Sequence, residues 1–220
     1  MRANKDCEAR QIGRASRIQV ASLADREYTM RKLILVRHSL PEIVSDLPAN
    51  QWRLSDTGRL RCKRLAERLA TYDPDMIVAS LEPKAIETGR IVADILGKPF
   101  ETAGNLHEHD RSNVGPLDTK EQFEARVASF FENPQKLVFG REMADDAHRR
   151  FAKAVAGVIR KHPSGNLAVV THGTVMTLFV ARAAGLDSFP FWKRLGLPSF
   201  VVLSLPGFGL LTVVEDVEVE

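Results

Sequence analysis

Two histidines and an arginine follow apolar runs at points of the chain that are far apart in sequence. Arg37 and His38 come directly after the aliphatic residues 33–36, and His172 comes directly after the similar run 167–171. Such runs are typical of strands buried on both faces of a parallel sheet. Because the carboxyl ends of parallel strands share one edge, where such sheets bind ligands, we expect these three side chains to converge on one crevice.

A lysine is expected at the same edge of the sheet. The apolar run 76–79 ends at Ser80, and Pro83 is well placed in the first turn of a following helix. Lys84 therefore lies near a helix N-terminus, where its own charge and the free backbone N–H groups both favour an anion. A later loop, residues 106–110, adds further ionisable side chains that could contribute to the crevice.

Together these groups describe a pocket for a phosphoryl group. Cations, imidazoles and backbone N–H donors suit the negative charge that spreads over the phosphoryl oxygens during transfer. The sequence has no Walker-type loop and no aspartates at strand ends to hold Mg²⁺, so the nucleophile would have to be a side chain. A neutral imidazole can take this role and form a phosphohistidine.

Strand-like and helix-like segments alternate along the chain, which predicts an α/β fold. Helices are expected where apolar residues recur at helical spacing: from Asp56, over Pro83–Leu96, over about Glu121–Phe131, from Asp145 or Asp146 to Arg160, and over Thr174–Ala184. Two β-rich runs, 199–205 and 210–214, predict a hairpin with an antiparallel strand. We therefore predict a three-layer α/β/α sandwich with a mostly parallel central sheet, one antiparallel member and a small helical insertion at about residues 117–145.

The bulk composition is ordinary for one globular domain. The 220 residues are 44% hydrophobic and 27% charged, with a net charge of +3 and a pI of about 9.0. The charges are mixed along the chain, so nothing favours binding to nucleic acid. Cys7 and Cys62 form no CxxC pair, and no apolar run reaches the length of a membrane span. We expect a cytoplasmic protein without nucleic-acid or membrane partners.

The first residues carry no recognisable chemistry. Residues 1–29 mix basic, acidic and small polar side chains without clear periodicity, and a second methionine, Met30, follows them. We predict that residues 1–29 form a flexible extension and that residues 30–220 form a single domain. An Arg-rich targeting segment is the alternative, but four acidic residues within this stretch disfavour a transit peptide.

Five ordered sequence blocks carry a resemblance to a known family. They are Leu33–Ser39 (LILVRHS), Leu54–Gly58 (LSDTG), Ser80–Thr88 (SLEPKAIET), Leu106–Glu108 (LHE) and Val170–Gly173 (VTHG). In this order and spacing they resemble the histidine phosphatase superfamily, on its phosphoglycerate-mutase-like branch, over about residues 32–215. The resemblance implies the fold of that family and a phosphoryl transfer that needs neither a metal nor another cofactor.

The resemblance also implies roles for individual residues. His38 would be the nucleophile that takes the phosphoryl group, and Arg37 would bind its oxygens. His172 would lie beside His38 and donate a hydrogen bond to the same phosphate. The backbone of Gly173 and Thr174 would be close by.

Glu108 would act as the general acid that protonates the leaving alcohol and then as the base for the attacking water. This role favours a carboxyl group with a raised pKa. The neighbouring His109 and Asp110 are alternatives for the acid–base work. A metal site built from His107, His109 and a strand-end histidine is a further alternative, although a His-x-His pair alone is a weak ligand signal.

Two residues depart from the usual pattern of the family. Ser39 stands where the family usually has glycine, and its small hydroxyl would either be tolerated there or add one donor to the phosphate. Lys84 stands where the family has a second phosphate-binding arginine, and lysine keeps the charge but loses the planar bidentate fork. Loss of one oriented donor typically costs about 10²–10³ in rate. Arg90 and Arg111 could compensate if they reach the pocket.

We therefore predict a phosphomonoesterase that acts on a small phosphorylated metabolite through a phosphohistidine on His38. A cofactor-dependent phosphoglycerate mutase is the first alternative, but it needs extra basic contacts, and residues 41–53 supply little positive charge. A catalytically weakened, phosphate-binding or regulatory family member is the second alternative, motivated by Lys84. The residues that select the substrate are expected in the segment 41–53 and in the insertion 117–145. The sequence leaves the substrate and the formation of homo-oligomers open.

Overall fold

The computed structural model describes residues 30–114 and 119–217. The extension predicted for residues 1–29 lies outside the described residues. From Arg31 onward the described residues form one compact unit. No helix within these described ranges is long and apolar enough to cross a membrane.

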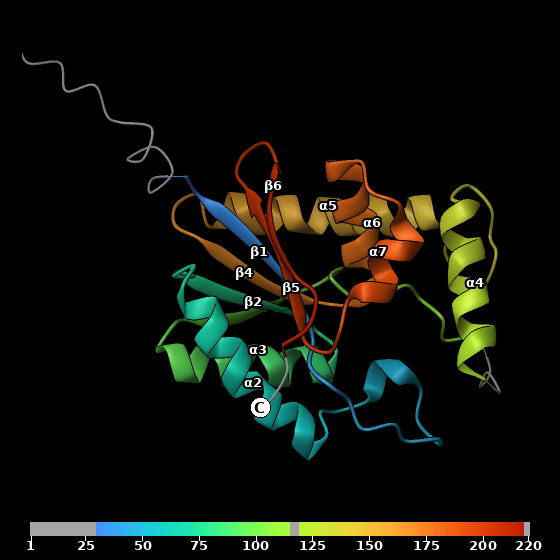
Figure 1. Cartoon of the computed structure of the whole chain (residues 1–220), viewed down its shortest axis with the longest axis horizontal. Coiled ribbons are helices and arrows are strands. Elements are labelled where there is room, and N and C mark those ends of the chain that lie inside the picture. Colours follow the sequence, from blue (N-terminus) through green and yellow to red (C-terminus); the bar gives the residue numbers. More distant parts are fainter. Residues whose placement is uncertain (1–29, 115–118, 218–220) are drawn as a thin grey trace, which may run out of the picture. The chain divides into compact units, whose positions relative to one another are not determined.

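The described residues form a six-stranded sheet with the strand order β3-β2-β4-β1-β5-β6. Its strands are β1 (Lys32–Arg37), β2 (Met76–Ser80), β3 (Phe100–Ala103), β4 (Leu167–Thr171), β5 (Ser199–Ser204) and β6 (Leu210–Val214). β1, β4, β2 and β3 pair in parallel, whereas β5 runs antiparallel to both β1 and β6. The sheet is mostly parallel with one antiparallel member, as predicted (Figure 1).

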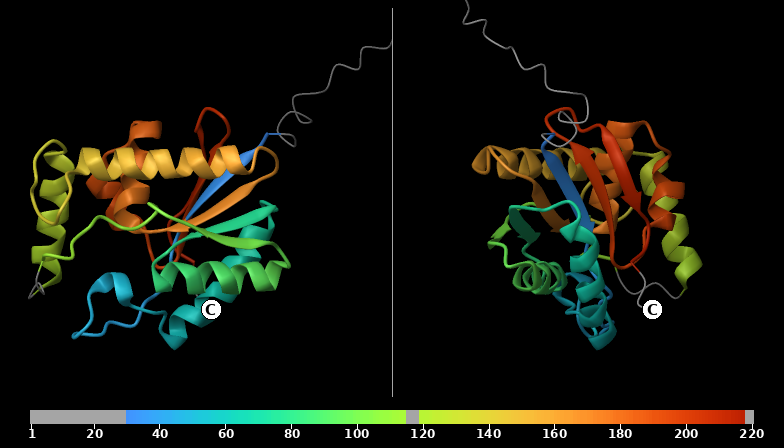
Figure 2. Two further views of the ribbon diagram at one scale, coloured as in Figure 1. Left: turned by 180° about the vertical axis from the view of Figure 1, so that it is seen from behind. Right: turned by 60° about the vertical axis from the view of Figure 1, so that its left-hand side comes forward.

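Helices cover both faces of the sheet (Figure 2). One face carries α2 (Asp56–Ala70) and α3 (Pro83–Leu96), and the other carries α5 (Ala144–Lys161) and α6 (Gly173–Ala184). Successive residues of β1 point to opposite faces, so Leu33 and Leu35 join the core under α5 and α6. Ile34 and Val36 join the core under α2 and α3. The predicted three-layer α/β/α sandwich is confirmed.

The local signals in the sequence located most helix ends. Ser55 caps α2 by accepting a hydrogen bond from the Gly58 N–H at 3.0 Å. Pro83 occupies the first turn of α3, and Gly97 ends that helix in the left-handed region, at φ 63°. The bounds predicted for α5 and α6 differ from the observed bounds by one or two residues.

The predicted insertion contains α4 (Lys120–Glu132), which packs on a short helix, α7 (Ser188–Arg194). Sequence patterns missed α7, the 3-10 helix η1 (Ala49–Gln51) and the edge strand β3. These elements are too short to show a period, and β3 lacks the continuous apolar run of the inner strands because its residues are only partly buried. Two of the three missed elements, η1 and α7, contribute residues to the site described below.

Candidate active site

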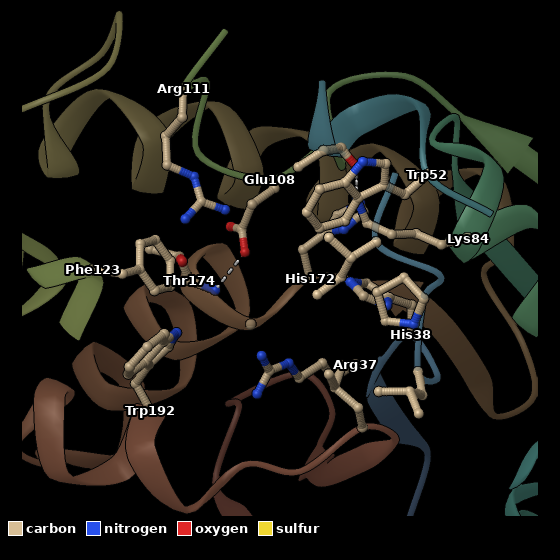
Figure 3. A pocket seen from close by; sticks show the side chains of 16 residues that line it. Arg37, His38, Trp52, Lys84, Glu108, Arg111, Phe123, His172, Thr174 and Trp192 are labelled. Carbon is tan, nitrogen blue, oxygen red and sulfur yellow. Dashed lines mark hydrogen bonds between the residues drawn. The ribbon is translucent and has the colours of Figure 1, made fainter. Parts of the chain in front are cut away.

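A cavity of about 250 Å³ lies at the carboxyl ends of β1, β2 and β4. Arg37 and His38 lie at the end of β1, Lys84 lies in the first turn of α3, and His172 is the residue that precedes α6. These four side chains and Glu108 all line the cavity (Figure 3). The structure thus brings together the groups that the sequence places at this edge, and their catalytic roles stay predictions.

The hydrogen bonding of His38 leaves Nε2 able to act as a nucleophile. The residue is only 7% exposed, and Nδ1 lies 2.8 Å from the carbonyl oxygen of Ser39, to which it can donate. The hydrogen on Nδ1 leaves a lone pair on Nε2. Burial, together with the nearby His172 and Lys84, holds the pKa of His38 well below its ordinary range. The imidazole is therefore neutral at physiological pH, as a nucleophile must be.

Arg37 has a buried side-chain nitrogen without a partner among the described residues. Nη1 donates to the carbonyl oxygen of Leu195, whereas the buried Nε has no hydrogen-bond partner among the described residues. Burial lowers the pKa of Arg37 to about 10, which still leaves a cation at neutral pH. A Cβ atom on Gly173 would lie 2.9 Å from Nε, so only glycine lets the start of α6 approach the guanidinium this closely.

His172 also has a buried ring nitrogen that pairs with no group in the described part of the chain. The side chain is fully buried, with Nε2 2.9 Å from the Ser80 hydroxyl and 3.4 Å from Glu82 Oε1. Nδ1 is buried and makes no hydrogen bond within the described part of the chain. The ring centroids of His172 and His38 are 5.1 Å apart. Buried polar atoms are rarely left unpaired in proteins, so Nδ1 is a hydrogen-bonding atom still available on a side chain that lines the cavity.

Glu82, for which no sequence pattern predicted a role, connects several members of the site. Its carboxylate is 2.7 Å from Lys84 Nζ and accepts the Glu108 N–H at 2.9 Å, in addition to facing His172. Lys84 Nζ also donates to the Ala49 carbonyl oxygen at 2.6 Å. Because an ammonium has three donors, one remains for a phosphate. The acidic residue two places before the lysine, at the N-cap of α3, was the available sequence signal.

Glu108 is held as a carboxylate by the start of α6. Oε2 accepts the Thr174 N–H at 3.0 Å, and Oε1 accepts the N–H groups of Val175 at 3.2 Å and His109 at 2.9 Å. Burial favours a higher pKa for Glu108, but the charges of Arg111 and His172 and the backbone donors together hold the pKa well below its ordinary range.

Two expectations are therefore corrected. The raised pKa expected for Glu108 is wrong for the protein alone, because the carboxylate is stabilised by a helix N-terminus and nearby positive charge. The Thr174 N–H, expected close to the phosphate, is already bonded to Glu108, although Thr174 and Gly173 do line the cavity.

The prediction that Ser39 donates to the phosphate is wrong. Its hydroxyl donates to the Gly58 carbonyl oxygen at 2.8 Å, and its N–H donates to the Thr88 hydroxyl at 3.0 Å. Ser39 is fully buried between α2 and α3 and does not line the cavity. The physical reason is its direction: its side chain points to α2, whereas the preceding residue, His38, lines the cavity.

Of the two arginines that could compensate for Lys84, only Arg111 reaches the cavity. Its guanidinium lies 5.0 Å from the ring centroid of Phe123, and it points toward Glu108 in Figure 3. The guanidinium of Arg90 instead lies 5.0 Å from the Phe100 ring, away from the cavity lining. Nothing in the sequence distinguished the two, because the outcome depends on the path of the loop before α4.

The alternative metal site is not formed among the described residues, where no three His, Cys, Asp or Glu side chains gather to hold a metal. The ring of His109 stacks on Phe130 with centroids 4.1 Å apart, and Phe139 lies edge-on at 4.8 Å. His109 therefore belongs to the core beneath the site. The carboxylate of Asp110, the other alternative to Glu108, accepts the Ser112 N–H and does not line the cavity.

We expect Lys84→Met to lower kcat/KM about 10²–10³-fold, because a charged donor beside His38 is lost. The same change should lower the free energy of unfolding by about 3–5 kcal/mol, since it leaves the Glu82 carboxylate buried without its cation. Steady-state kinetics and denaturant unfolding of the purified variant measure the two effects.

The double variant Glu82→Gln/Lys84→Met separates the two effects. Removal of both charges should restore most of the stability, and the amide oxygen introduced at position 82 can still accept the Glu108 N–H. Activity should stay low if the ammonium acts on the phosphate. Recovery of activity together with stability would show that Lys84 has only a structural role.

Comparisons with known proteins identify the family to which the chain belongs. The sequence model of the histidine phosphatase superfamily (branch 1) matches residues 33–208. A curated relative, phosphoglycerate mutase-like protein 4 of Arabidopsis thaliana, is 31% identical over 137 residues, which span 59% of this chain and 60% of that protein.

Two solved phosphatase structures share the fold. The mycobacterial glucosyl-3-phosphoglycerate phosphatase in complex with VO3 has a TM-score of 0.66 and 22% identity, covering 84% of this chain and 98% of that one. The alpha-ribazole phosphatase from Shigella flexneri has a TM-score of 0.63 and 20% identity, covering 86% and 99%. With the family match across most of the chain, these likenesses lead to one conclusion: the chain belongs to the histidine phosphatase superfamily, on its phosphoglycerate-mutase-like branch.

Proposed function

We propose that this protein is a phosphomonoesterase that hydrolyses a small phosphorylated metabolite through a phosphohistidine on His38. One observation carries the proposal: Arg37 Nε and His172 Nδ1 are buried without partners among the described residues, and both side chains line the same cavity as the neutral His38 ring. If the Ser80 hydroxyl donates to His172 Nε2, Nδ1 carries the hydrogen and can donate to a phosphoryl oxygen. Oriented donors around the nucleophile are what phosphoryl transfer requires.

The proposed reaction has two steps that use side chains of this chain. His38 Nε2 attacks phosphorus, so an N–P bond forms while the bond from phosphorus to the alcohol oxygen breaks. Glu108 gives the departing oxygen its proton. Water then attacks phosphorus, the N–P bond breaks, and Glu108 accepts the proton that the water loses. Inorganic phosphate and the alcohol are the products.

Glu108 must acquire a proton before the first step, because it is ionised in the protein alone. The negative charge of a bound phosphoryl group opposes ionisation of a nearby carboxyl group and so raises its pKa. A phosphomonoester that enters as the monoanion can also bring the proton. In the proposed mechanism Glu108 is therefore protonated only when the substrate is bound.

Hydrolysis is favoured over the mutase reaction by the outer lining of the cavity. Beyond the residues around His38, Arg111 is the one cationic side chain among the residues that line the described cavity. A sugar-acid substrate needs extra basic contacts for its carboxylate as well as for its phosphate. The segment 41–53 contributes apolar residues to this lining instead, including Ile43 and Trp52.

The test is to trap the phosphoenzyme. Incubation of the full chain with a phosphomonoester labelled in the phosphoryl group, followed by an alkaline quench, should give a labelled protein that loses its label in acid. Inorganic phosphate should accumulate in the unquenched reaction. A protein that takes up no label and releases no phosphate would contradict the enzymatic proposal and favour a phosphate-binding or regulatory role.

A panel of phosphorylated metabolites, assayed with and without 2,3-bisphosphoglycerate, separates the two enzymatic alternatives. A phosphatase should release inorganic phosphate from several esters without the bisphosphate. Isomerisation of a phosphoglycerate that depends on the bisphosphate would instead identify a mutase.

A further inference from the structure

The lining of the cavity divides into a polar centre and an apolar outer wall. The centre consists of the side chains around His38 described above. The outer wall is made largely of Leu40, Pro41, Ile43, Trp52, Phe123 and Trp192. These residues come from the segment after β1, from α4 and from α7, so separate elements contribute apolar surface to one wall. A phosphoryl group at the centre therefore leaves its alcohol against this wall.

Side-chain contacts hold the aromatic part of the wall in place. The ring of Phe123 meets that of Trp192 edge to face, with centroids 5.8 Å apart, and Arg111 lies over Phe123. Trp192 is in turn stacked on Phe189 at 6.0 Å, and it is only 9% exposed. In Figure 3 Phe123 and Trp192 lie side by side across the cavity from His38. Rings that are already fixed lose little conformational freedom when a ligand binds.

In the part of the wall around Trp52, the polar groups already have hydrogen-bond partners within the protein. The indole N–H of Trp52 lies within hydrogen-bond distance of the carbonyl oxygens of Val44 and Leu47, at 3.1 and 3.0 Å. The carbonyl oxygen of Ala49 accepts from Lys84, and that of Leu197 accepts from Arg61. A polyol bound against the apolar side chains of this part would exchange hydrogen bonds to water for apolar contacts, which is unfavourable.

We propose that the substrate is a phosphomonoester whose alcohol carries an aromatic ring, which packs against the wall formed by Trp52, Phe123 and Trp192. This inference rests on the proposed function for the position of the phosphoryl group. Aromatic rings prefer edge-to-face or offset contact with other rings, and the wall supplies several such surfaces. The affinity for the alcohol then comes from apolar burial rather than from hydroxyl recognition.

The test compares two esters with similar leaving groups. 2-Phenylethyl phosphate and glycerol 1-phosphate are both esters of primary alcohols, so their leaving groups are similar. A difference in kcat/KM between them therefore reports on binding of the ring and not on leaving-group ability. We expect kcat/KM to be about 10–100-fold higher for the phenylethyl ester, the factor that burial of one aromatic side chain supplies. Equal or lower kcat/KM for this ester would overturn the inference and leave the proposed hydrolysis intact.

A binding measurement makes the inference independent of turnover. Both tryptophans of the chain line the cavity, so intrinsic tryptophan fluorescence reports directly on its occupation. The full chain is titrated with 3-phenylpropylphosphonate and with 3,4-dihydroxybutylphosphonate, which mimic the two esters and cannot be hydrolysed. Tighter binding of the phenyl compound without hydrolysis of any ester would support the inference that the wall binds an aromatic ring, and it would contradict the proposed function. Failure of both compounds to bind would overturn the inference.

An exposed wall residue allows a variant with little effect on folding. Ile43 lines the cavity and is 74% exposed, so Ile43→Ala removes apolar wall without opening the core. Ile95 on α3 is 49% exposed and lies outside the cavity lining, which makes Ile95→Ala the matched control. We expect Ile43→Ala to reduce the preference for the phenylethyl ester roughly threefold or more, and Ile95→Ala to leave it unchanged. If Ile43→Ala and Ile95→Ala both kept the ratio of kcat/KM values measured for the native protein, the assignment of Ile43 to the wall would be contradicted.

Discussion

Replacement of His38 by alanine is expected to abolish the labelled phosphoenzyme and to lower turnover by a factor on the order of 10⁴–10⁶. The imidazole is the neutral nucleophile in the proposed mechanism, and alanine offers no atom that could form the N–P bond. Donors such as Arg37 and His172 would remain, so substrate should still bind. Phosphoenzyme formation is measured by the label retained after an alkaline quench, and turnover is measured by the release of phosphate. Binding is measured by titration with a phosphonate.

His148→Ala is the matched control for this variant. His148 lies on α5, where its ring stacks on Phe179 with centroids 6.3 Å apart, and it does not line the cavity. This control should keep both its label and its turnover. Label that persists in His38→Ala would show that another residue is the nucleophile, and His172 would be the next residue to test.

Glu108→Gln is expected to lower kcat about 10²–10⁴-fold for alkyl phosphates, whose alkoxide leaving groups need a proton. The loss should be much smaller for p-nitrophenyl phosphate, because nitrophenolate departs without protonation. The ratio of the two losses is the diagnostic quantity. Equal losses for both esters would show that Glu108 shapes the cavity but does not transfer a proton to the leaving group.

The same variant needs a stability control, because the Glu108 carboxylate accepts several backbone N–H groups at the start of α6. The pKa of Glu108 is lower in the folded protein than in the unfolded chain, so its ionisation stabilises the fold above the unfolded pKa of about 4.3. This contribution is lost as the pH falls toward the folded pKa. The difference in free energy of unfolding between the native protein and Glu108→Gln should therefore be large at pH 7 and should narrow below about pH 4.

The sequence was most informative where local chemistry and local structure coincide. The runs that precede His38 and His172 are so apolar that buried parallel strands were the simplest interpretation, and the strand ends then placed both histidines at one edge. Capping signals such as Ser55 and Pro83 fixed the starts of two helices within the layers. These features depend on neighbours in sequence, so a single chain is enough to recognise them.

What the sequence did not reveal depends on contacts between distant segments. Glu82 and His172 are far apart in sequence but meet at 3.4 Å, and no local pattern indicates such a pair. The direction of the Ser39 hydroxyl was equally hidden, because it is set by Gly58 on the neighbouring helix. The aromatic wall could not be predicted either, since Trp192 resembles any other apolar residue in the sequence and only α7 brings it to the cavity.

The carboxylate of Glu82 constrains how this site can change in evolution. It interacts with the Lys84 ammonium, the Glu108 backbone and the His172 ring, so a substitution at position 82 alters three partners together. An arginine at position 84 would meet the same carboxylate, and its bidentate fork would be drawn toward Glu82 rather than toward the phosphate. Positions 82 and 84 are therefore expected to act as a pair, and Lys84→Arg alone would change the contacts of Glu82 as well as those of the phosphate.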